Sequence, residues 1–142
     1  MASLIPSLNS CINRMQSGEK RFAWRIGSHL EDDYLCWYEL PVGKRKRYSD
    51  FIIMHPARGL LLLEVKDWKL DTIQKIDKST ATIITPRGLK TVSNPLEQVR
   101  QCTYQLIQRL EKEGFTLWAI QQGFVDPRDA RTLQVDAIFF RV

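Results

Sequence analysis

The apolar side chains of the first thirty residues follow a helical rather than an alternating pattern. Within residues 11–30 they recur at steps of three and four, which predicts helix. Gly18 interrupts the pattern, so a break there would start a second helix near Glu19. Residues 1–10 lack periodicity and predict a loosely ordered lead-in, with Ser10 available to cap the first helix.

Three later stretches predict β-strands. Residues 34–40, 48–54 and 60–68 are rich in aromatic, branched and leucine side chains. A turn with four consecutive cations, residues 41–47, separates the first two. The connection at residues 55–59 is short enough for a hairpin, so the second and third strands are expected to be antiparallel neighbours.

The clearest helix lies in the second half of the chain, after weaker strand signals at residues 70–76 and 81–85. Asn94 is suited to an N-cap and Pro95 to the first helical position. An apolar stripe follows, and Gly114 is expected to end the helix as its C-cap.

The remaining residues complete a mixed α/β pattern. Residues 115–120 predict a strand, 123–131 a loop and 133–142 another strand. Helix, three strands, a less regular stretch, helix and strands, in this order, predict one α/β domain over residues 1–142. The chain ends in apolar strand material at residues 139–142, which favours its being the N-terminal part of a longer polypeptide.

Composition narrows the class of protein without identifying it. The length suits one domain with a core of its own, and no apolar run approaches the roughly 20 residues of a membrane span. The N-terminus lacks a secretory pattern. Cys11, Cys36 and Cys102 have no metal-binding spacing and predict buried fillers in a reducing, cytoplasmic setting. The net charge of +5 suits an anionic partner.

Charged residues at the ends of two predicted strands are the first candidate for chemistry. Glu64 and Lys66 are two residues apart and would share one face of a strand. Asp50 opens the preceding strand, so an antiparallel hairpin would bring it towards Glu64. Buried charge is costly unless it is paired or holds a metal, which favours a cation-dependent hydrolytic site. The alternative is structural: a Glu64–Lys66 ion pair on an edge strand, with Asp50 as a turn residue.

Four segments in order resemble the nuclease-related domain (NERD) family of the PD-(D/E)xK restriction-endonuclease-like superfamily, over about residues 3–113. They are Gly18-Glu19, Asp50-Phe51-Ile52-Ile53, Gly59-Leu60-Leu61-Leu62-Leu63-Glu64-Val65-Lys66 and Asn94-Pro95-Leu96-Glu97-Gln98. The resemblance implies a restriction-endonuclease-like core, α-β-β-β-α-β, with a mixed central sheet flanked by helices. It also implies a divalent-metal nuclease site.

The resemblance assigns a role to each site residue. Asp50 and Glu64 would bind Mg²⁺, with Mn²⁺ as a second option, and Glu19 would add a ligand directly or through water. Lys66 would position or activate the attacking water and steady the phosphate. Gln98 would contact the water or the DNA phosphate. The structural alternatives are a solvated helix position for Glu19 and a first-turn surface position for Gln98.

Two departures from the family pattern leave questions open. Ser49 stands where many relatives have proline before the aspartate. Some relatives carry a glutamine and a tyrosine four residues apart on the later helix, whereas here Gln98 is followed by Cys102 at that step. Gln101 lies on the adjacent turn of the same helix, so either glutamine could face the site.

The cationic turn and the partners complete the sequence-based expectations. Lys44, Arg45, Lys46 and Arg47 would bind nucleic-acid phosphates, or else form a solvated hairpin tip. His55, beside Pro56, is expected to be a turn residue. The expected activity is hydrolysis of DNA phosphodiesters, with RNA as an alternative substrate, a fused or associated helicase as a partner, no membrane association and an open oligomeric state. The competing functions are a non-catalytic nucleic-acid-binding module and an interaction domain on the same fold.

Overall fold

The computed structural model describes residues 1–122 and 135–141, with side chains as far as residue 115. The helices are α1 (Leu8–Cys11), α2 (Ser17–His29), α3 (Pro95–Lys112) and the short 3-10 helix η1 (Leu70–Thr72). The strands are β1 (Ser3–Ile5), β2 (Leu35–Tyr38), β3 (Phe51–His55), β4 (Gly59–Leu63), β5 (Ile73–Ile76), β6 (Thr80–Thr85), β7 (Gly88–Ser93), β8 (Phe115–Gln122) and β9 (Val135–Arg141).

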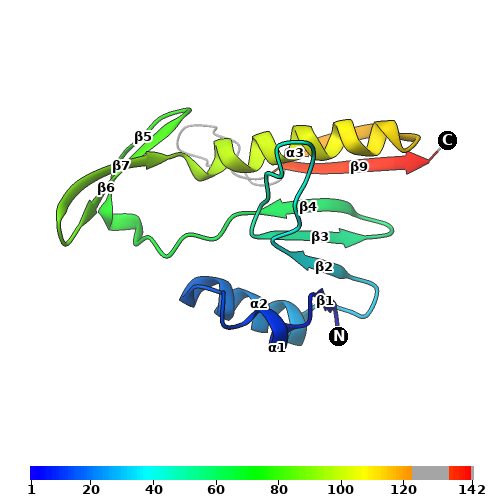
Figure 1. Cartoon of the computed structure of the whole chain (residues 1–142), viewed down its shortest axis with the longest axis horizontal. Helices are drawn as coiled ribbons and strands as arrows, with labels where there is room; N and C mark the ends of the chain where they lie inside the picture. The colour runs from blue at the N-terminus through cyan, green and yellow to red at the C-terminus, as the bar shows by residue number, and fades with distance from the viewer. Residues whose placement is uncertain (123–134, 142) are drawn as a thin grey trace.

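Six strands form the main sheet in the order β1-β2-β3-β4-β9-β8 (Figure 1). β1 runs parallel to β2, and the other neighbours are antiparallel. The predicted hairpin is present, because Phe51 pairs with Leu63 at one end and His55 with Gly59 at the other. The expected succession α-β-β-β-α-β corresponds to α2, β2, β3, β4, α3 and β8, so the predicted fold class is confirmed.

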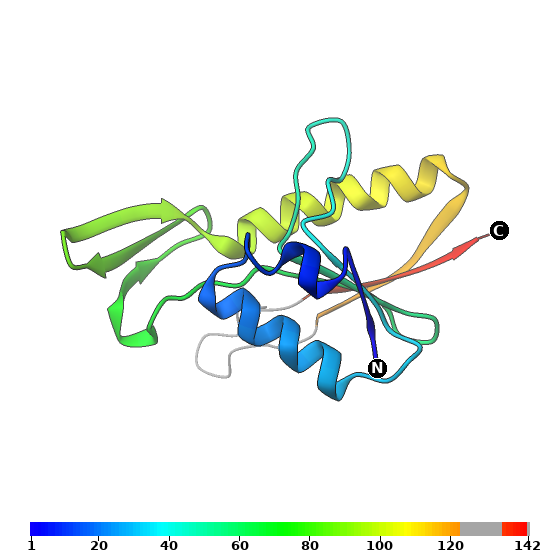
Figure 2. The ribbon, with the colours of Figure 1, turned by 60° about the horizontal axis from the view of Figure 1, so that its bottom comes forward.

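The two faces of this sheet bury different clusters, as the alternation of a strand requires. Phe51 and Ile53 face the first cluster, which includes Ala23 and Ile26 of α2. Ile52 and Leu62 face the second, which includes Cys102 of α3. α2 and α3 therefore cover opposite faces of the β2-β3-β4 region (Figures 1 and 2). The three cysteines are free and buried, as their spacing predicted.

The N-terminal lead-in is more regular than the sequence predicted. β1 pairs with β2, and the side chain of Leu4 packs against the first cluster. α1 begins at Leu8 after Ser7, so the expectation that Ser10 caps a helix beginning at Cys11 is wrong. The sequence pattern missed β1 because its stability comes from pairing with a strand some thirty residues away in the chain.

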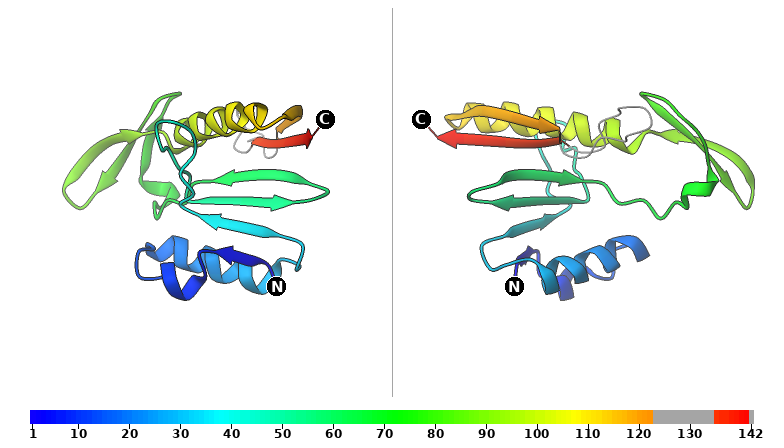
Figure 3. Two further views of the ribbon diagram at one scale, coloured as in Figure 1. Left: turned by 45° about the vertical axis from the view of Figure 1, so that its right-hand side comes forward. Right: turned by 180° about the vertical axis from the view of Figure 1, so that it is seen from behind.

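The third strand is shorter than predicted. β4 ends at Leu63 rather than near Trp68, and residues 64–69 lead away without regular structure. They connect to a separate three-stranded sheet, β5-β6-β7, which extends from one side of the molecule (Figure 3). β7 was not predicted, because most of its residues are exposed and it lacks an apolar alternation.

The predicted start of α3 is confirmed, whereas the predicted C-cap, Gly114, is one residue too late. Asn94 accepts a hydrogen bond from the Leu96 backbone N–H at 2.9 Å, and Pro95 occupies the first turn. The C-cap residue is Glu113, and Gly114 follows it with φ of 86°. β8 contains the strand predicted at residues 115–120, and β9 covers most of the strand predicted at residues 133–142. The loop predicted at residues 123–131 lies outside the described residues.

Membrane-spanning segments are absent from the part of the chain that the structure describes. No helix there combines the length and the apolar character that crossing a bilayer requires.

Candidate active site

Asp50 and Glu64 lie at the same end of the β3-β4 hairpin. Phe51 pairs with Leu63, so Asp50 and Glu64 are the next residues outward on the two chain segments. The Val65 backbone N–H donates to Asp50 Oδ2 at 2.7 Å, which joins the segments beyond the last ladder pair. The hairpin that the sequence predicted therefore brings these two carboxylate-bearing residues to one place.

Glu64 is a buried carboxylate with one occupied and one unpaired oxygen. Lys66 Nζ contacts Glu64 Oε1 at 2.7 Å. The Glu64 side chain is 4% exposed and that of Lys66 is 35% exposed, so the ammonium lies between the buried acid and solvent. Glu64 Oε2 is buried and has no hydrogen-bond partner among the residues that the structure describes. Buried polar atoms are nearly always paired, so this oxygen marks a position that favours a ligand.

The pKa of Asp50 is shifted by its burial and by the charged groups around it. Burial raises this pKa from 3.8 to about 6, and the carboxylates of Glu64 and Glu19 raise it as well. The Val65 N–H and the Lys66 ammonium act in the opposite direction. Asp50 thus lies within electrostatic reach of Glu19, Glu64 and Lys66, all of which the sequence resemblance had assigned to the site.

Glu19 approaches from α2 and is held by two donors. Its Oε2 accepts from the Gln16 backbone N–H at 2.9 Å and from the Tyr38 hydroxyl at 2.8 Å. Tyr38 pairs with Phe51 in the sheet, next to Asp50. Sequence reasoning missed Tyr38, whose only signal was a polar group within an apolar strand. Because both donors bind the same oxygen, Glu19 has a fixed carboxylate that still offers its other oxygen.

Asp67 fixes the segment that carries Glu64 and Lys66 against the start of α2. Its Oδ2 accepts from the Gly18 backbone N–H at 3.1 Å, and its Oδ1 lies 3.4 Å from the Arg21 guanidinium. A Cβ at position 18 would lie 2.4 Å from Asp67 Oδ1, so a larger residue before Glu19 would displace the Asp67 carboxylate from this contact. Sequence reasoning missed Asp67, although its place three residues after Glu64 was visible.

α3 approaches the site through Cys102. Burial raises the pKa of the Cys102 thiol, and the nearby Glu64 carboxylate raises it further. Gln98 lies one turn before Cys102 and is exposed, and no hydrogen bond engages its side chain in the described region. Gln101 instead donates from Nε2 to Glu97 Oε1 at 3.1 Å. Of the two candidate glutamines, Gln98 is the one whose amide has no bond to another described residue.

The cationic turn extends away from Asp50 as a hairpin tip. Val42 and Arg47 form an isolated bridge, with the Val42 N–H donating to the Arg47 carbonyl at 2.7 Å. Lys44, Arg45 and Lys46 are exposed beyond this bridge, and Arg47 is half-buried. The chain then returns through Tyr48 and the buried Ser49 to Asp50, so the tip and the candidate site share one short connection.

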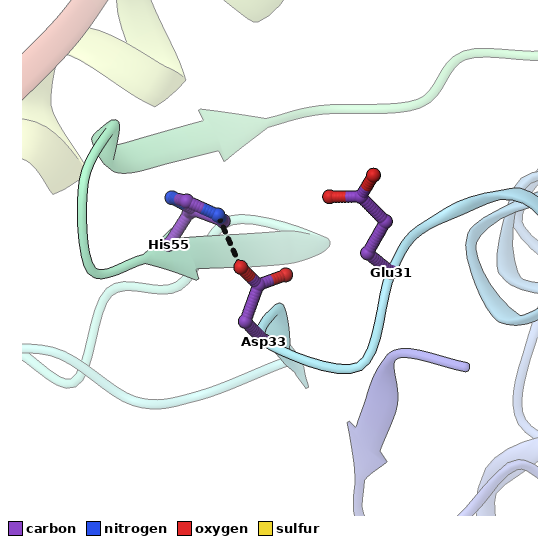
Figure 4. Close-up of side chains that lie close together, drawn as sticks. All are labelled: Glu31, Asp33 and His55. Carbon is purple, nitrogen blue, oxygen red and sulfur yellow. Dashed lines mark hydrogen bonds and ion pairs between the residues drawn. The ribbon is translucent and has the colours of Figure 1, made fainter.

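A second acidic cluster lies at the other end of the hairpin (Figure 4). The ligand atoms of Glu31, Asp33 and His55 all lie within 4.8 Å of one another. Within the described residues this is the one such group of three, so the carboxylates of Glu19, Asp50 and Glu64 are less closely gathered. The prediction that His55 is a turn residue is wrong, because it is the buried last residue of β3.

The hydrogen bonds of His55 explain its burial without a metal. The Ala57 backbone N–H donates to His55 Nδ1 at 3.0 Å, so this nitrogen carries no proton. The proton of the neutral ring is therefore on Nε2, which donates to Asp33 Oδ2 at 2.7 Å. Both ring nitrogens are occupied, and Nε2 would have to lose its proton before it could bind an ion.

The sheet covered by helices on both faces, with acidic residues and a lysine at the end of its hairpin, defines a nuclease-like α/β fold. A family model, nuclease-related domain, matches residues 14–138, which is most of the chain. The chain therefore belongs to the nuclease-related domain family. Comparisons with curated proteins and with solved structures give no match.

Proposed function

We propose that this protein is a divalent-metal-dependent nuclease that hydrolyses DNA phosphodiester bonds. The observation that carries the proposal is Glu64 Oε2, a buried carboxylate oxygen without a donor in the described part of the chain, close to Asp50 and beside the Lys66 ammonium. A purely structural ion pair would be stabilised by full hydrogen bonding of the buried acid. Membership of the nuclease-related family supports the same chemistry.

The residues at this site suit Mg²⁺, or Mn²⁺ in its place. Mg²⁺ takes oxygen ligands, commonly one or two carboxylates, and retains several waters. Asp50 and Glu64 would provide the two carboxylates, and Glu19 would bind one of the waters through its less engaged oxygen. When bound, such an ion polarises a phosphoryl oxygen and lowers the pKa of a bound water. Because water molecules would complete the coordination of the ion, the carboxylates of Glu19, Asp50 and Glu64 need not all lie within direct contact of it.

The remaining residues would act on the phosphate. Lys66 carries a partly exposed ammonium, which would stabilise the negative charge that develops as water attacks in line with the leaving oxygen. Gln98 would donate its amide N–H groups to the water or to a phosphate oxygen. Tyr38 and Asp67 would act as positioning residues, because they hold Glu19 and the segment containing Glu64.

A cleavage assay tests the proposal. The purified protein is incubated with linear, circular and single-stranded DNA, and with a matching RNA, in Mg²⁺ or in chelator. We expect cleavage in Mg²⁺ alone, and loss of cleavage in Lys66→Ala. Equal cleavage by the parent protein and by Lys66→Ala would identify a contaminating enzyme and contradict the proposal. So would the absence of cleavage on every substrate.

One observation favours a second candidate, a non-catalytic nucleic-acid-binding module. The Lys66–Glu64 contact at 2.7 Å partly neutralises the site without an ion, as a structural pair would. This candidate predicts salt-dependent DNA binding with no cleavage, and no gain in affinity when Mg²⁺ replaces chelator, because Mg²⁺ then acts only as a competing counterion. The two candidates thus differ in a single titration of DNA affinity against Mg²⁺.

A further inference from the structure

A groove of about 800 Å³ lies between the hairpin tip and the C-terminal half of α3. Figure 2 shows the loop of residues 41–47 standing beside that helix. Leu40, Val42 and Leu106 provide apolar lining. The sequence had singled out the tip alone, whereas the fold adds a second wall from a helix more than fifty residues away in the chain.

Both walls of the groove are cationic. Lys44 and Arg45 line it from the tip, and Arg109 and Lys112 from α3. Arg109 pairs with Glu113 at 2.9 Å, but both side chains are more than half exposed, so that pair is weak. Within the described residues the other three cations have no ion-pair partner. Four positive charges around one concave surface attract an anionic ligand.

An unpaired acceptor lies within the same groove. Gln105 Oε1 is buried and has no hydrogen-bond partner in the described part of the chain. It lies against Gly43, whose φ is +70°, and a Cβ at that position would be 2.4 Å from the Gln105 oxygen. Glycine at position 43 therefore allows the tip to sit on α3 with the amide enclosed. Such an oxygen favours a ligand that donates an N–H or an O–H.

We propose that this groove binds a nucleic-acid strand, with its phosphates on the four cations and a base N–H donor on Gln105. The inference rests on the proposed function for the class of substrate and adds the surface that holds it. Phosphate alone satisfies the cations but supplies no donor to Gln105, whereas the edges of the bases carry N–H donors. The apolar lining by Leu40, Val42 and Leu106 suits the base faces.

The position of the groove links it to the candidate active site. The tip that forms one wall returns directly through Ser49 to Asp50. α3 forms the other wall, and its Cys102 lies near Glu64. A strand in the groove would thus lie beside the segments that lead to Asp50 and Glu64, without occupying the carboxylate site itself.

The first test measures binding in chelator, where no cleavage occurs. A short fluorescein-labelled DNA strand is titrated with the parent, with Arg109→Gln/Lys112→Gln and with a control of equal charge change, Lys75→Gln/Lys90→Gln. The control residues are exposed on the small sheet. Losing two phosphate contacts should weaken binding roughly tenfold and lower the salt slope by about 1.5. No loss, an equal loss in the control, or no binding by the parent would overturn the proposal.

The second test uses Gln105→Met, which keeps the side-chain volume and removes the unpaired oxygen. We expect a higher Tm, because a buried orphan acceptor disappears, together with DNA binding weakened several-fold. Binding of inorganic polyphosphate, which has no base N–H donors, should stay unchanged. Unchanged DNA affinity, or an equal loss for polyphosphate, would contradict the role of Gln105 and leave only a general anion surface.

These outcomes are separable from those of the cleavage assay. Failure of the nuclease proposal would appear as absent Mg²⁺-dependent cleavage, with groove-dependent binding in chelator still measurable. Failure of the groove proposal would appear as cleavage that persists while the groove variants bind DNA like the parent.

Discussion

The two acidic clusters at opposite ends of the β3-β4 hairpin have opposite hydrogen-bonding states. At one end, Glu64 is buried with an oxygen that no described residue pairs, and the pKa of Asp50 is raised to about 6, mainly by burial. At the other, both ring nitrogens of His55 are engaged, and Asp33 is half exposed to solvent. The cluster whose ligand atoms lie closer together is therefore the one whose buried histidine has hydrogen bonds at both ring nitrogens.

This contrast shows that closeness alone does not identify a ligand site. Glu31, Asp33 and His55 would be selected by distance, but hydrogen bonds already engage both ring nitrogens of His55, one of them with Asp33. Asp50 and Glu64 hold buried charge that the described residues leave partly uncompensated. Buried charge without full compensation lowers stability, and it persists where function requires it.

The largest effect is expected from Glu64→Gln compared with Asp33→Ala. The first removes a charge at the unsatisfied end and should reduce Mg²⁺-dependent cleavage by at least about a hundredfold, as loss of a group that stabilises the transition state typically does. The second changes the satisfied end and should leave cleavage within about twofold, since it adds no barrier to the reaction. Equal losses in the two variants, measured as initial cleavage rates, would remove the contrast.

Added metal should stabilise the protein by binding at the Asp50–Glu64 end of the β3-β4 hairpin and not at the His55 end. At a concentration about 100 times the dissociation constant, a ligand of the folded state adds roughly 2.7 kcal/mol to the free energy of unfolding. We expect Mn²⁺ to raise the Tm of the parent protein and of Asp33→Ala, and to leave that of Glu64→Gln unchanged. If Asp33→Ala abolished the shift instead, the assignment of the two clusters would be reversed.

Asp50→Asn should stabilise the metal-free protein. The folded-state pKa of Asp50 is raised from 3.8 to about 6, so the folded state holds the proton more tightly and loses stability as pH rises through that interval. The shift corresponds to roughly 3 kcal/mol at neutral pH. In chelator, urea unfolding should show a gain of about 1–3 kcal/mol for Asp50→Asn at pH 7.5 and almost none at pH 4. A loss of stability at pH 7.5 would contradict the stated cause of the pKa shift.

At the satisfied end, Asp33→Ala should cost stability instead. It removes the acceptor of the His55 Nε2–H and leaves a buried donor unpaired. Because Asp33 is half exposed, water can replace part of the bond, and we expect a loss of about 1 kcal/mol in urea unfolding at neutral pH. An increase in stability would indicate that this cluster, too, is strained and not satisfied.

The smallest effect distinguishes the two glutamines of α3. Gln98 is exposed and available, whereas Gln101 is bonded to Glu97. We expect Gln98→Ala to slow cleavage by several-fold, which corresponds to the loss of about one hydrogen bond. Gln101→Ala is the matched control and should leave the cleavage rate unchanged. The reverse ranking would show that Gln101 faces the substrate.

The sequence predicted those elements whose signals are local. Asn94, Pro95 and Gly114 mark the ends of α3 because capping depends on neighbouring residues. The hairpin followed from two apolar runs and a short turn, and it placed Asp50 and Glu64 at one end. The proposed catalytic roles of these residues stay predictions until activity is measured.

The remaining features depend on contacts between distant residues. β1 is stabilised by β2, and the Gly18 N–H reaches Asp67 across 49 residues. The bond from Tyr38 to Glu19 joins two elements that no local pattern connects. The hydrogen bond of the buried His55 ring likewise depends on Asp33, which is 22 residues away in the chain. Pattern and spacing identify which residues can do chemistry, but their hydrogen bonds decide which acids are left unsatisfied.

The most direct measurement is a crystal structure of the protein grown with Mn²⁺, with the ion located by its anomalous scattering. The account predicts an ion in contact with the carboxylates of Asp50 and Glu64, and with water between it and Glu19. An ion bound only by Glu31, Asp33 and His55, or no ion near Asp50 and Glu64 at saturating Mn²⁺, would contradict it.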